Sequence, residues 1–258
     1  MILDSSDISK EVPVTLTAEP DKQTVADWVL ITTKAQDTLS TKPWLEHLVD
    51  SHTVIVVLQN GIHHEERLNQ INHGAFVLPG LVYVAVERIS PGHIVHHGGS
   101  RILVPKGEYG ERFRDMLSGS DTEVLLEPDF LTTAWKKLLT NVAANPITAL
   151  TLQRIGIMQH PDIEKLARGL LEEAVAVGQA TGARVGQEDI EQTLNFYAQF
   201  KPDDGTSMLY DRLAGRTLEH EYITGAVVSM GEQYRIATPL NQIFLTLLRA
   251  CASNVQIS

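Results

Sequence analysis

Two short apolar runs in the first half of the chain most constrain its fold. The runs, Trp28–Thr33 and Thr53–Leu58, are rich in β-branched residues, and each is followed by a polar-apolar stretch of helical length. Strands are continuously apolar where both faces of a sheet are covered, as in parallel sheets built from βαβ units. We therefore predict an α/β domain with a parallel sheet in this half of the chain.

The segments after these runs are predicted to add further strands. Phe76–Val84 is apolar, with an interruption at Pro79-Gly80. Farther on, Gly98-Gly99-Ser100 separates two short runs, a pattern typical of a hairpin with a glycine turn. We therefore expect Ile94–His97 and Arg101–Val104 to pair as the two arms of that hairpin.

From Asp129 onward, the apolar spacing changes to the period of helices. We place a boundary near Glu127-Pro128 and predict two domains, residues 1–128 and residues 129–258. Glycines and prolines punctuate the second domain into separate helices. These are expected at Asp129–Leu150, Pro161–Thr181, Glu188–Phe200, Glu219–Tyr234 and Leu240–Ser253.

Composition and charge exclude several classes of partner. The 258 residues are 43% hydrophobic and carry 32 acidic against 21 basic side chains, without a long single-sign run. Binding to nucleic acid needs a concentrated basic surface, so we expect no nucleic acid partner. Apolar runs such as Val54–Leu58 are far shorter than the roughly 20 residues of a membrane helix, so no membrane partner is expected.

Cysteine and histidine usage bounds the compartment and the metal content. The single cysteine, Cys251, can form neither an internal disulfide nor a thiolate cage for a metal. The first residues, Met1–Lys10, lack the apolar core of a secretory signal, and we expect a cytoplasmic protein. The adjacent pairs His63-His64 and His96-His97 lack the spacing of metal ligands, so we expect no metal site.

Three polar residues at four-residue steps form the first candidate site. Lys137, Asn141 and Asn145 would lie on one slanted stripe of a helix, because two steps of four turn the helix only about 80° beyond full circles. A lysine and two amides on one face suit an oxygen-rich anionic substrate. Lys136 points away from this stripe, and Pro146 is expected to kink or end the helix just after Asn145.

Each candidate also has a structural interpretation. The stripe can be a solvated helix face, and spacing alone favours that reading. In the second cluster, Ser207 can cap a short helix, and Glu219 can lie in a first turn where the helix dipole favours acids. Asp211 is expected to pair with Arg212 or Arg216.

The motifs together resemble the ketopantoate reductase (2-dehydropantoate 2-reductase) family, from about Leu3 to Leu248. The resemblance rests on two parts of the second domain, a lysine and two asparagines followed by Pro-Ile-Thr, and two motifs about 70 residues later. Two N-terminal signatures agree with it. These motifs are Lys137 to Thr148, Ser207-Met-x-x-Asp211, Glu219-x-x-Tyr-Ile-x-Gly225, Thr33-Lys34-Ala35 and Leu58-Gln59-Asn60-Gly61.

The resemblance implies a Rossmann domain, a helical domain, and a reaction between NADPH and a 2-keto acid. Lys137 matches the lysine that donates the proton as hydride reaches the ketone. The positions that match those holding the substrate are Asn141, Asn145 and Ser207, and those that match cofactor contacts are Lys34, Asn60, Ala85 and Glu219. The partner implied is a small keto acid, and a homodimer is among the assemblies expected.

Two departures from the family pattern qualify these expectations. The Gly-x-Gly-x-x-Gly turn that binds a pyrophosphate does not occur in the sequence. Judged from Thr33-Lys34-Ala35, the chain begins roughly 40 residues late relative to that pattern, so we expect impaired NADPH binding and an uncovered sheet edge. Ile155 also stands where the family often has another substrate-binding asparagine.

Two alternative functions remain open at this stage. One is another hydroxyacid dehydrogenase with the same two-domain plan. The other is a non-catalytic remnant that acts as a helical interaction or dimerisation module, because the first βα unit is absent.

Overall fold

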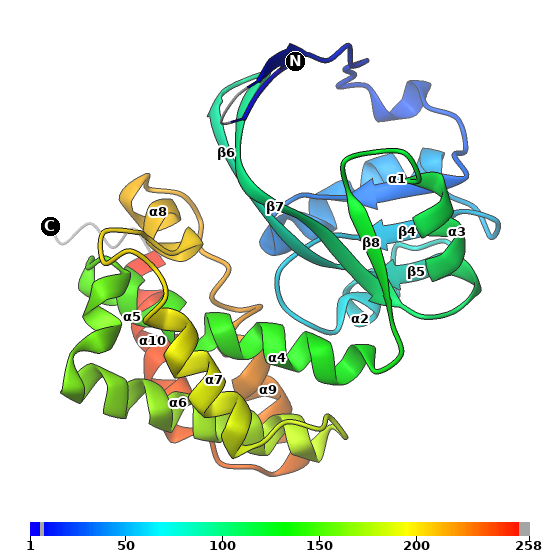
Figure 1. The fold of residues 1–258 in the computed structure, drawn as a ribbon. Coiled ribbons are helices and arrows are strands. Elements are labelled where there is room, and N and C mark those ends of the chain that lie inside the picture. Colours follow the sequence, from blue (N-terminus) through cyan, green and yellow to red (C-terminus); the bar gives the residue numbers. More distant parts are fainter. Residues whose placement is uncertain (6–7, 253–258) are drawn as a thin grey trace, which may run out of the picture. The chain divides into compact units, whose positions relative to one another are not determined.

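The computed structural model describes residues 1–5 and 8–252 and divides into two compact units (Figure 1). The first unit comprises Met1–Thr33, Asp37–Gln59 and His63–Phe130. The second comprises the described chain from Leu131 onward together with two short segments, Lys34–Gln36 and Asn60–Ile62. The described strands and three short α-helices build the first unit, whereas the second is helical, so the predicted fold class, an α/β sheet domain plus a helical domain, is confirmed.

A three-stranded parallel sheet in the order β3-β4-β5 forms one part of the first unit. Its strands run from Trp28 to Ile31 (β3), Val54 to Val57 (β4) and Phe76 to Pro79 (β5). The central strand β4 is buried at all four positions, as the continuous apolar run predicts. The connecting elements are η2 (Ala35–Thr41), α1 (Lys42–Leu48) and α2 (His64–Leu68), of which α1 and α2 bury Leu45 and Leu68.

A second sheet completes this unit and is centred on β7 (His93–Pro105). Strand β6 (Leu81–Ser90) pairs with β7 in antiparallel orientation, and β8 (Glu123–Glu127) pairs with it in parallel. The remaining elements are β1 (Ile2–Asp4), β2 (Ser9–Glu11), η1 (Pro20–Lys22) and α3 (Glu108–Met116).

The predicted hairpin with a turn at residues 98–100 is wrong. Strand β7 continues through this segment without a turn. The turn that joins β7 to β6 lies at Pro91-Gly92. Gly98 and Gly99 have positive φ angles where the β6–β7 register shifts, so they form an irregularity within the strand. A Cβ atom on Gly99 would lie 2.2 Å from the carbonyl oxygen of Tyr83. Gly99 therefore marks a close approach between the two backbones, whereas a Cβ atom on Gly98 would meet no atom within 4 Å.

The interruption expected at Pro79-Gly80 is confirmed. Strand β5 ends at Pro79 and β6 starts at Leu81, and the two strands belong to different sheets. A Cβ atom on Gly80 would lie 2.6 Å from the Cδ2 atom of Leu58, so a larger residue here would require the Leu58 side chain to shift.

The second unit is a packed group of helices around α6 (Pro161–Ala180), whose Leu170, Leu171 and Ala174 are fully buried. None of the described helices is long and apolar enough to cross a membrane. The other elements are α4 (Phe130–Val142), α5 (Ala144–Thr151), η3 (Ile155–Gln159), α7 (Gln187–Tyr197), α8 (Ser207–Leu213), α9 (Thr224–Tyr234) and α10 (Pro239–Ala252).

The single helix predicted over residues 129–150 is divided, and the division falls earlier than expected. Helix α4 ends at Val142 and α5 starts at Ala144, whereas the sequence placed the kink after Asn145. Pro146 has no N–H to donate to the carbonyl of Val142, and its ring crowds that carbonyl. A proline therefore disturbs the helix one turn before its own position.

Two other predicted helix ends also differ. The helix predicted from Glu219 starts at Thr224, because residues 219–223 form turns before it, so Glu219 is not in a first helical turn. The helix predicted to reach Phe200 ends at Tyr197. The expected end at Ser253 lies outside the described residues.

Helix α10 begins on a side chain that belongs to α6. The Glu173 carboxylate accepts hydrogen bonds from the backbone N of Leu240 (2.8 Å), the backbone N of Asn241 (2.9 Å) and the Asn241 amide (2.8 Å). These donors belong to the first turn of α10, where backbone N–H groups have no partner within the helix. Glu173 thus caps α10 from a neighbouring helix.

Replacing Glu173 with alanine is expected to lower the free energy of unfolding by about 1–3 kcal/mol, because three donors lose a charged acceptor. Chemical denaturation measures this change. The matched control is Glu172→Ala, at an exposed neighbour, with an expected change within about 0.5 kcal/mol. Equal losses in both variants would contradict the capping role.

Candidate active site

A cavity of about 210 Å³ lies within the helical unit, close to the break between α4 and α5. Its volume lies below the roughly 300–1,000 Å³ of pockets for drug-sized ligands, so it suits only a small molecule such as a short organic acid. The polar side chains that line it are Thr140, Asn141, Asn145, Thr206, Ser207 and Tyr197. The other lining residues are Ala144, Ile155, Phe196, Phe200 and Gly205. The structure therefore brings together all three residues predicted to hold a substrate.

Asn145 is the buried donor of this cavity. Its side chain is only 3% exposed, and its Nδ2 atom has no hydrogen-bond partner among the described residues. Buried amides are almost always hydrogen-bonded, since an unpaired buried donor costs about 1–3 kcal/mol. A donor that lines a cavity and has no protein partner is suited to a ligand oxygen.

The break between α4 and α5 is supported by Tyr197. Its hydroxyl donates to the carbonyl oxygens of Leu139 (3.2 Å) and Thr140 (3.1 Å), which lie near the end of α4. Burial raises the pKa of the Tyr197 hydroxyl, which therefore remains a donor. This contact fixes the junction that carries Asn141 on one side and Asn145 on the other.

Ser207 is not the cap of α8. Its neighbour Thr206 is the N-cap residue, and the Thr206 Oγ1 atom accepts from the backbone N of Leu209 at 3.2 Å. The same Oγ1 atom lies 2.7 Å from the hydroxyl of Thr148. Thr206, and not Ser207, therefore caps α8. Ser207 is the first residue of α8 and lines the cavity.

Lys137 lies on α4 one turn before Asn141 and is not among the residues that line the cavity. Burial lowers the pKa of its ammonium group from 10.5 to about 8, while the negative charge of Glu219 acts in the opposite direction. Its neighbour Lys136 is exposed and forms an ion pair with Asp189 at 3.0 Å. The two lysines therefore differ in environment, as their separation around the helix predicts.

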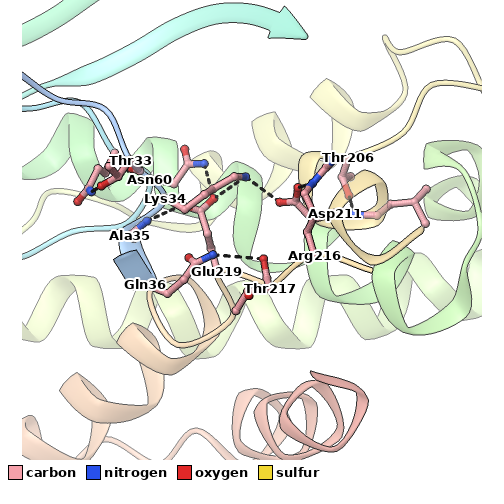
Figure 2. Close-up of polar contacts among 12 residues, drawn as sticks. Thr33, Lys34, Ala35, Gln36, Asn60, Thr206, Asp211, Arg216, Thr217 and Glu219 are labelled. Carbon is pink, nitrogen blue, oxygen red and sulfur yellow. Dashed lines mark hydrogen bonds and ion pairs between the residues drawn. The ribbon is translucent and has the colours of Figure 1, made fainter. Parts of the chain in front are cut away.

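Two buried carboxylates, Asp211 and Glu219, gather donors from distant parts of the sequence (Figure 2). The Lys34 ammonium lies 2.7 Å from Asp211 Oδ2 and 3.5 Å from Glu219 Oε2. Glu219 also accepts from the backbone N of Ala35 at 3.2 Å and from the Asn60 amide at 3.0 Å. We call Lys34, Asn60, Asp211 and Glu219 the carboxylate cluster.

The charges of the carboxylate cluster are balanced locally. Arg216 donates from Nε to Asp211 Oδ1 at 2.8 Å, so this arginine is the predicted partner of Asp211. Arg212, the other candidate, donates instead to the carbonyl of Cys251 at 3.0 Å. Burial by itself would lower the pKa of Lys34. The negative charges of Glu219 and Asp211 outweigh burial, so the pKa of Lys34 lies above its usual value.

A glycine explains how Asn60 reaches Glu219. Gly61 has a φ angle of +95°, and a Cβ atom there would lie 2.6 Å from the carbonyl oxygen of Tyr222. Only glycine allows this close approach between the two backbones. The Gln59-Asn60-Gly61 sequence therefore combines a hydrogen-bonding amide with the residue that lets it approach.

Three of the four predicted cofactor residues lie together in the second unit, and the fourth, Ala85, belongs to the first unit. Lys34, Asn60 and Glu219 belong to one cluster, whereas Ala85 is an exposed residue of β6 opposite Gly98, at the strand irregularity. Phe196, Tyr197 and Phe200 also line the cavity, although no sequence motif marks them as site residues. Their aromatic spacing is that of a core-facing helix stripe, which gives no sign of a cavity.

The sequence of this chain is similar to one known protein family along most of its length. The family model described as ketopantoate reductase PanE/ApbA matches residues 2–108, and the model of its C-terminal part matches residues 129–252. The 2-dehydropantoate 2-reductase of Caulobacter vibrioides is 35% identical over 90% of this chain and 80% of its own length. The chain belongs to the ketopantoate reductase family. The enzyme of that name from Mycobacterium tuberculosis is 32% identical, over 88% of this chain and 76% of the relative.

Solved ketopantoate reductases share the fold. The dimeric ketopantoate reductase from Staphylococcus aureus aligns with a TM-score of 0.89 and 25% identity, covering 98% of this chain and 87% of that one. The ketopantoate reductase from Ralstonia eutropha JMP134 gives the same TM-score and identity, covering 98% and 84%.

In this ketopantoate reductase family member, the negative charge of Glu219 is expected to raise the pKa of Lys137 and so to offset part of the effect of burial. Glu219→Gln keeps the size of the side chain and removes the negative charge that raises the pKa of Lys137, although one of its two acceptor oxygens becomes a donor. The pKa of Lys137 should then fall below about 8, and an activity that needs its proton should decline at lower pH than in the unaltered chain. The pH profile of kcat measures the shift.

The matched control for this change is Glu221→Gln. Glu221 lies two residues further on, and its carboxylate pairs with Arg249 at 2.6 Å. Its neutralisation is expected to leave the pH profile where it was. A profile that moves only in the Glu221 variant would contradict the coupling between Glu219 and Lys137.

Proposed function

We propose that this chain reduces a small 2-keto acid of the 2-dehydropantoate type to the 2-hydroxy acid, with NADPH as the hydride source. The observation that carries the proposal is the buried Asn145 amide, which lines a cavity of substrate size and has no partner among the described residues. Both relatives reported above are named 2-dehydropantoate 2-reductases and match along most of this chain, which supports catalysis over a non-catalytic remnant.

Asn141, Asn145 and Ser207 are assigned to the substrate. Their amide and hydroxyl groups offer donors to the carboxylate of a keto acid and to its other oxygens. Hydrogen bonds to a charged group contribute about 1.5–3 kcal/mol each, more than those between neutral groups. The side chains that line the cavity are uncharged, so they would bind the carboxylate through hydrogen bonds.

Lys137 is assigned the role of general acid. As hydride from the nicotinamide arrives at C2, the ketone becomes a hydroxyl only if its oxygen gains a proton, which the Lys137 ammonium provides. The lysine is left neutral and recovers a proton from water. Its pKa of about 8 favours this role, because the proton is still held at neutral pH and is released more readily than at the ordinary value.

The cofactor is assigned to residues 1–128 and the substrate to residues 129–258. Lys34 and Asn60 follow β3 and β4, and ligands bind outside the carboxyl ends of such parallel strands. The donors of the carboxylate cluster, with the acceptor Glu219, suit ribose hydroxyls and a carboxamide better than a phosphate, which two buried carboxylates would repel. Lys34 and Asn60, together with Glu219 from the second domain, would hold these parts of NADPH, and Ala85 is assigned to the cofactor on the family resemblance alone.

The proposal is tested with the purified chain, NADPH and 2-dehydropantoate, by following nucleotide absorbance and the hydroxy acid product. Keto acid-dependent oxidation of NADPH is expected, with NADH as the comparison for cofactor choice. Fluorescence titration measures NADPH affinity separately, and we expect it to be weakened because no Gly-x-Gly-x-x-Gly turn is present.

Calorimetric titration with 2-dehydropantoate tests the cavity independently of the cofactor. We expect binding that Asn145→Ala weakens. NADPH binding without any binding or reduction of the keto acid would overturn the proposed function. The Staphylococcus aureus ketopantoate reductase is dimeric, and we propose a homodimer for this chain as well.

A further inference from the structure

The cavity has an apolar side as well as a polar one. We call Ile155, Phe196 and Phe200 its apolar wall. The two phenylalanine rings pack edge to face with their centroids 4.9 Å apart, and each side chain remains 39% exposed. Ile155, in contrast, is only 4% exposed. The wall therefore presents apolar carbon to the cavity and contributes no hydrogen-bonding side-chain atom.

Backbone hydrogen bonds fix Ile155 in this wall. Its backbone N donates to the carbonyl of Asp204 at 2.9 Å, and the backbone N of Gly156 donates to the carbonyl of Pro202 at 3.0 Å. A Cβ atom on Gly156 would lie 3.0 Å from the Cβ atom of Pro202, so the two segments are in close contact. Ile155 cannot withdraw from the cavity without breaking this pairing.

Several polar lining groups are already engaged by the protein. The Thr140 hydroxyl donates to the carbonyl of Lys137 at 2.7 Å, and Tyr197 donates to the end of α4. Thr206 caps α8 and contacts Thr148. Of the polar lining side chains, this leaves Asn141, Asn145 and Ser207, the groups that the proposed function assigns to the substrate.

We propose that the apolar wall makes this enzyme a reductase for 2-keto acids whose branch at C3 is apolar, and that Ile155 determines this specificity. The inference rests on the proposed function and deepens it by naming the substrate class. An apolar branch gains by leaving water for this wall. A hydroxyl on the branch must instead compete for donors and acceptors that the carboxylate and ketone already use.

Two keto acids that differ by one hydroxyl test the proposal. 2-Dehydropantoate carries a hydroxymethyl group on its dimethyl-substituted carbon, and 3,3-dimethyl-2-oxobutanoate carries a methyl group there. An apolar pocket discriminates against an added hydroxyl by up to about 100-fold, whereas a site built to bind the hydroxyl rejects the compound without it by about 10⁴-fold or more. We expect kcat/KM for the compound without the hydroxyl to be equal or higher.

The specificity residue is tested by Ile155→Asn, with Ile155→Val as the matched control. The asparagine supplies a polar partner, so kcat/KM should shift toward 2-dehydropantoate by about tenfold or more, while the valine variant keeps the original preference. If the asparagine variant does not fold, Phe200→Ala provides a second test at a partly exposed position. It should selectively weaken the compound without the hydroxyl by about tenfold.

The outcomes separate the two proposals. Reduction of both keto acids, with 2-dehydropantoate preferred by more than about tenfold, would overturn the apolar branch specificity and leave the proposed function standing. A preference unchanged by Ile155→Asn and Phe200→Ala would also overturn it. Calorimetric binding of the two compounds gives the same comparison without turnover. Failure of both compounds to bind and to react would overturn the proposed function itself.

Discussion

Replacing Lys137 with alanine is expected to lower kcat by about 10²- to 10⁴-fold, the usual contribution of a general acid. The ketone oxygen would have to take its proton from water while the hydride arrives. The affinity for NADPH should remain nearly unchanged, because the role assigned to Lys137 concerns the substrate oxygen alone. Steady-state kinetics and nucleotide titration on the same preparations measure the two quantities.

Lys136→Ala is the internal control for this change. It removes an adjacent lysine that pairs with Asp189 on the surface, and a small effect on kcat is expected. A larger loss from Lys136→Ala than from Lys137→Ala would show that the assignment of the general acid is wrong.

The pH profile gives a second check on Lys137. Reduction requires the protonated lysine, so kcat should be steady below its pKa of about 8 and decline as the pH rises through that value. In the oxidative direction the neutral form is required, and the dependence should be reversed. A reductive kcat that rises between pH 8 and pH 10 would exclude Lys137 as the proton donor.

Asn145→Ala is expected to weaken binding of the keto acid by about 10- to 100-fold, because a charged carboxylate loses a buried hydrogen-bond donor. KM and the calorimetric dissociation constant should rise together, with a smaller loss of kcat. The free protein should fold normally, since the Asn145 Nδ2 atom contacts no acceptor among the described residues.

Asn195→Ala is the matched control for this prediction. Asn195 is an exposed residue of α7 that does not line the cavity. Its replacement should leave substrate affinity unchanged. A similar loss of affinity in both variants would indicate a general effect of asparagine removal on the helical unit.

The parallel sheet was predictable because Val54–Val57 is apolar at every position, which only a strand covered on both faces explains well. The position of the hairpin turn was not predictable. Gly98-Gly99 and Pro91-Gly92 are both typical turn sequences, and residue type alone does not show which of them forms the turn. The helix break illustrates a different limit. Pro146 signals a disturbance, but its steric effect acts on the preceding turn, so the break lies at Ala143.

The polar part of the site was more predictable than the apolar part. Four-residue spacing and family motifs pointed to Asn141 and Asn145, and both line the cavity. An apolar residue beside a cavity has the same sequence signature as one in a core, so spacing could not assign Phe196 to the cavity. The Lys34–Asp211 ion pair joins residues 177 positions apart, a separation at which spacing carries no information.

The buried ammonium of Lys137 has a consequence for how the enzyme can be improved. A lysine whose pKa is 10.5 when unfolded and about 8 when folded destabilises the folded state at neutral pH, because the unfolded chain binds its proton more tightly. Stability should rise between pH 8 and pH 10.5 as the folded state loses that proton, and Lys137→Met should raise the free energy of unfolding at neutral pH by about 1–3 kcal/mol. Selection for thermal stability alone would therefore remove the residue to which we assign the proton transfer.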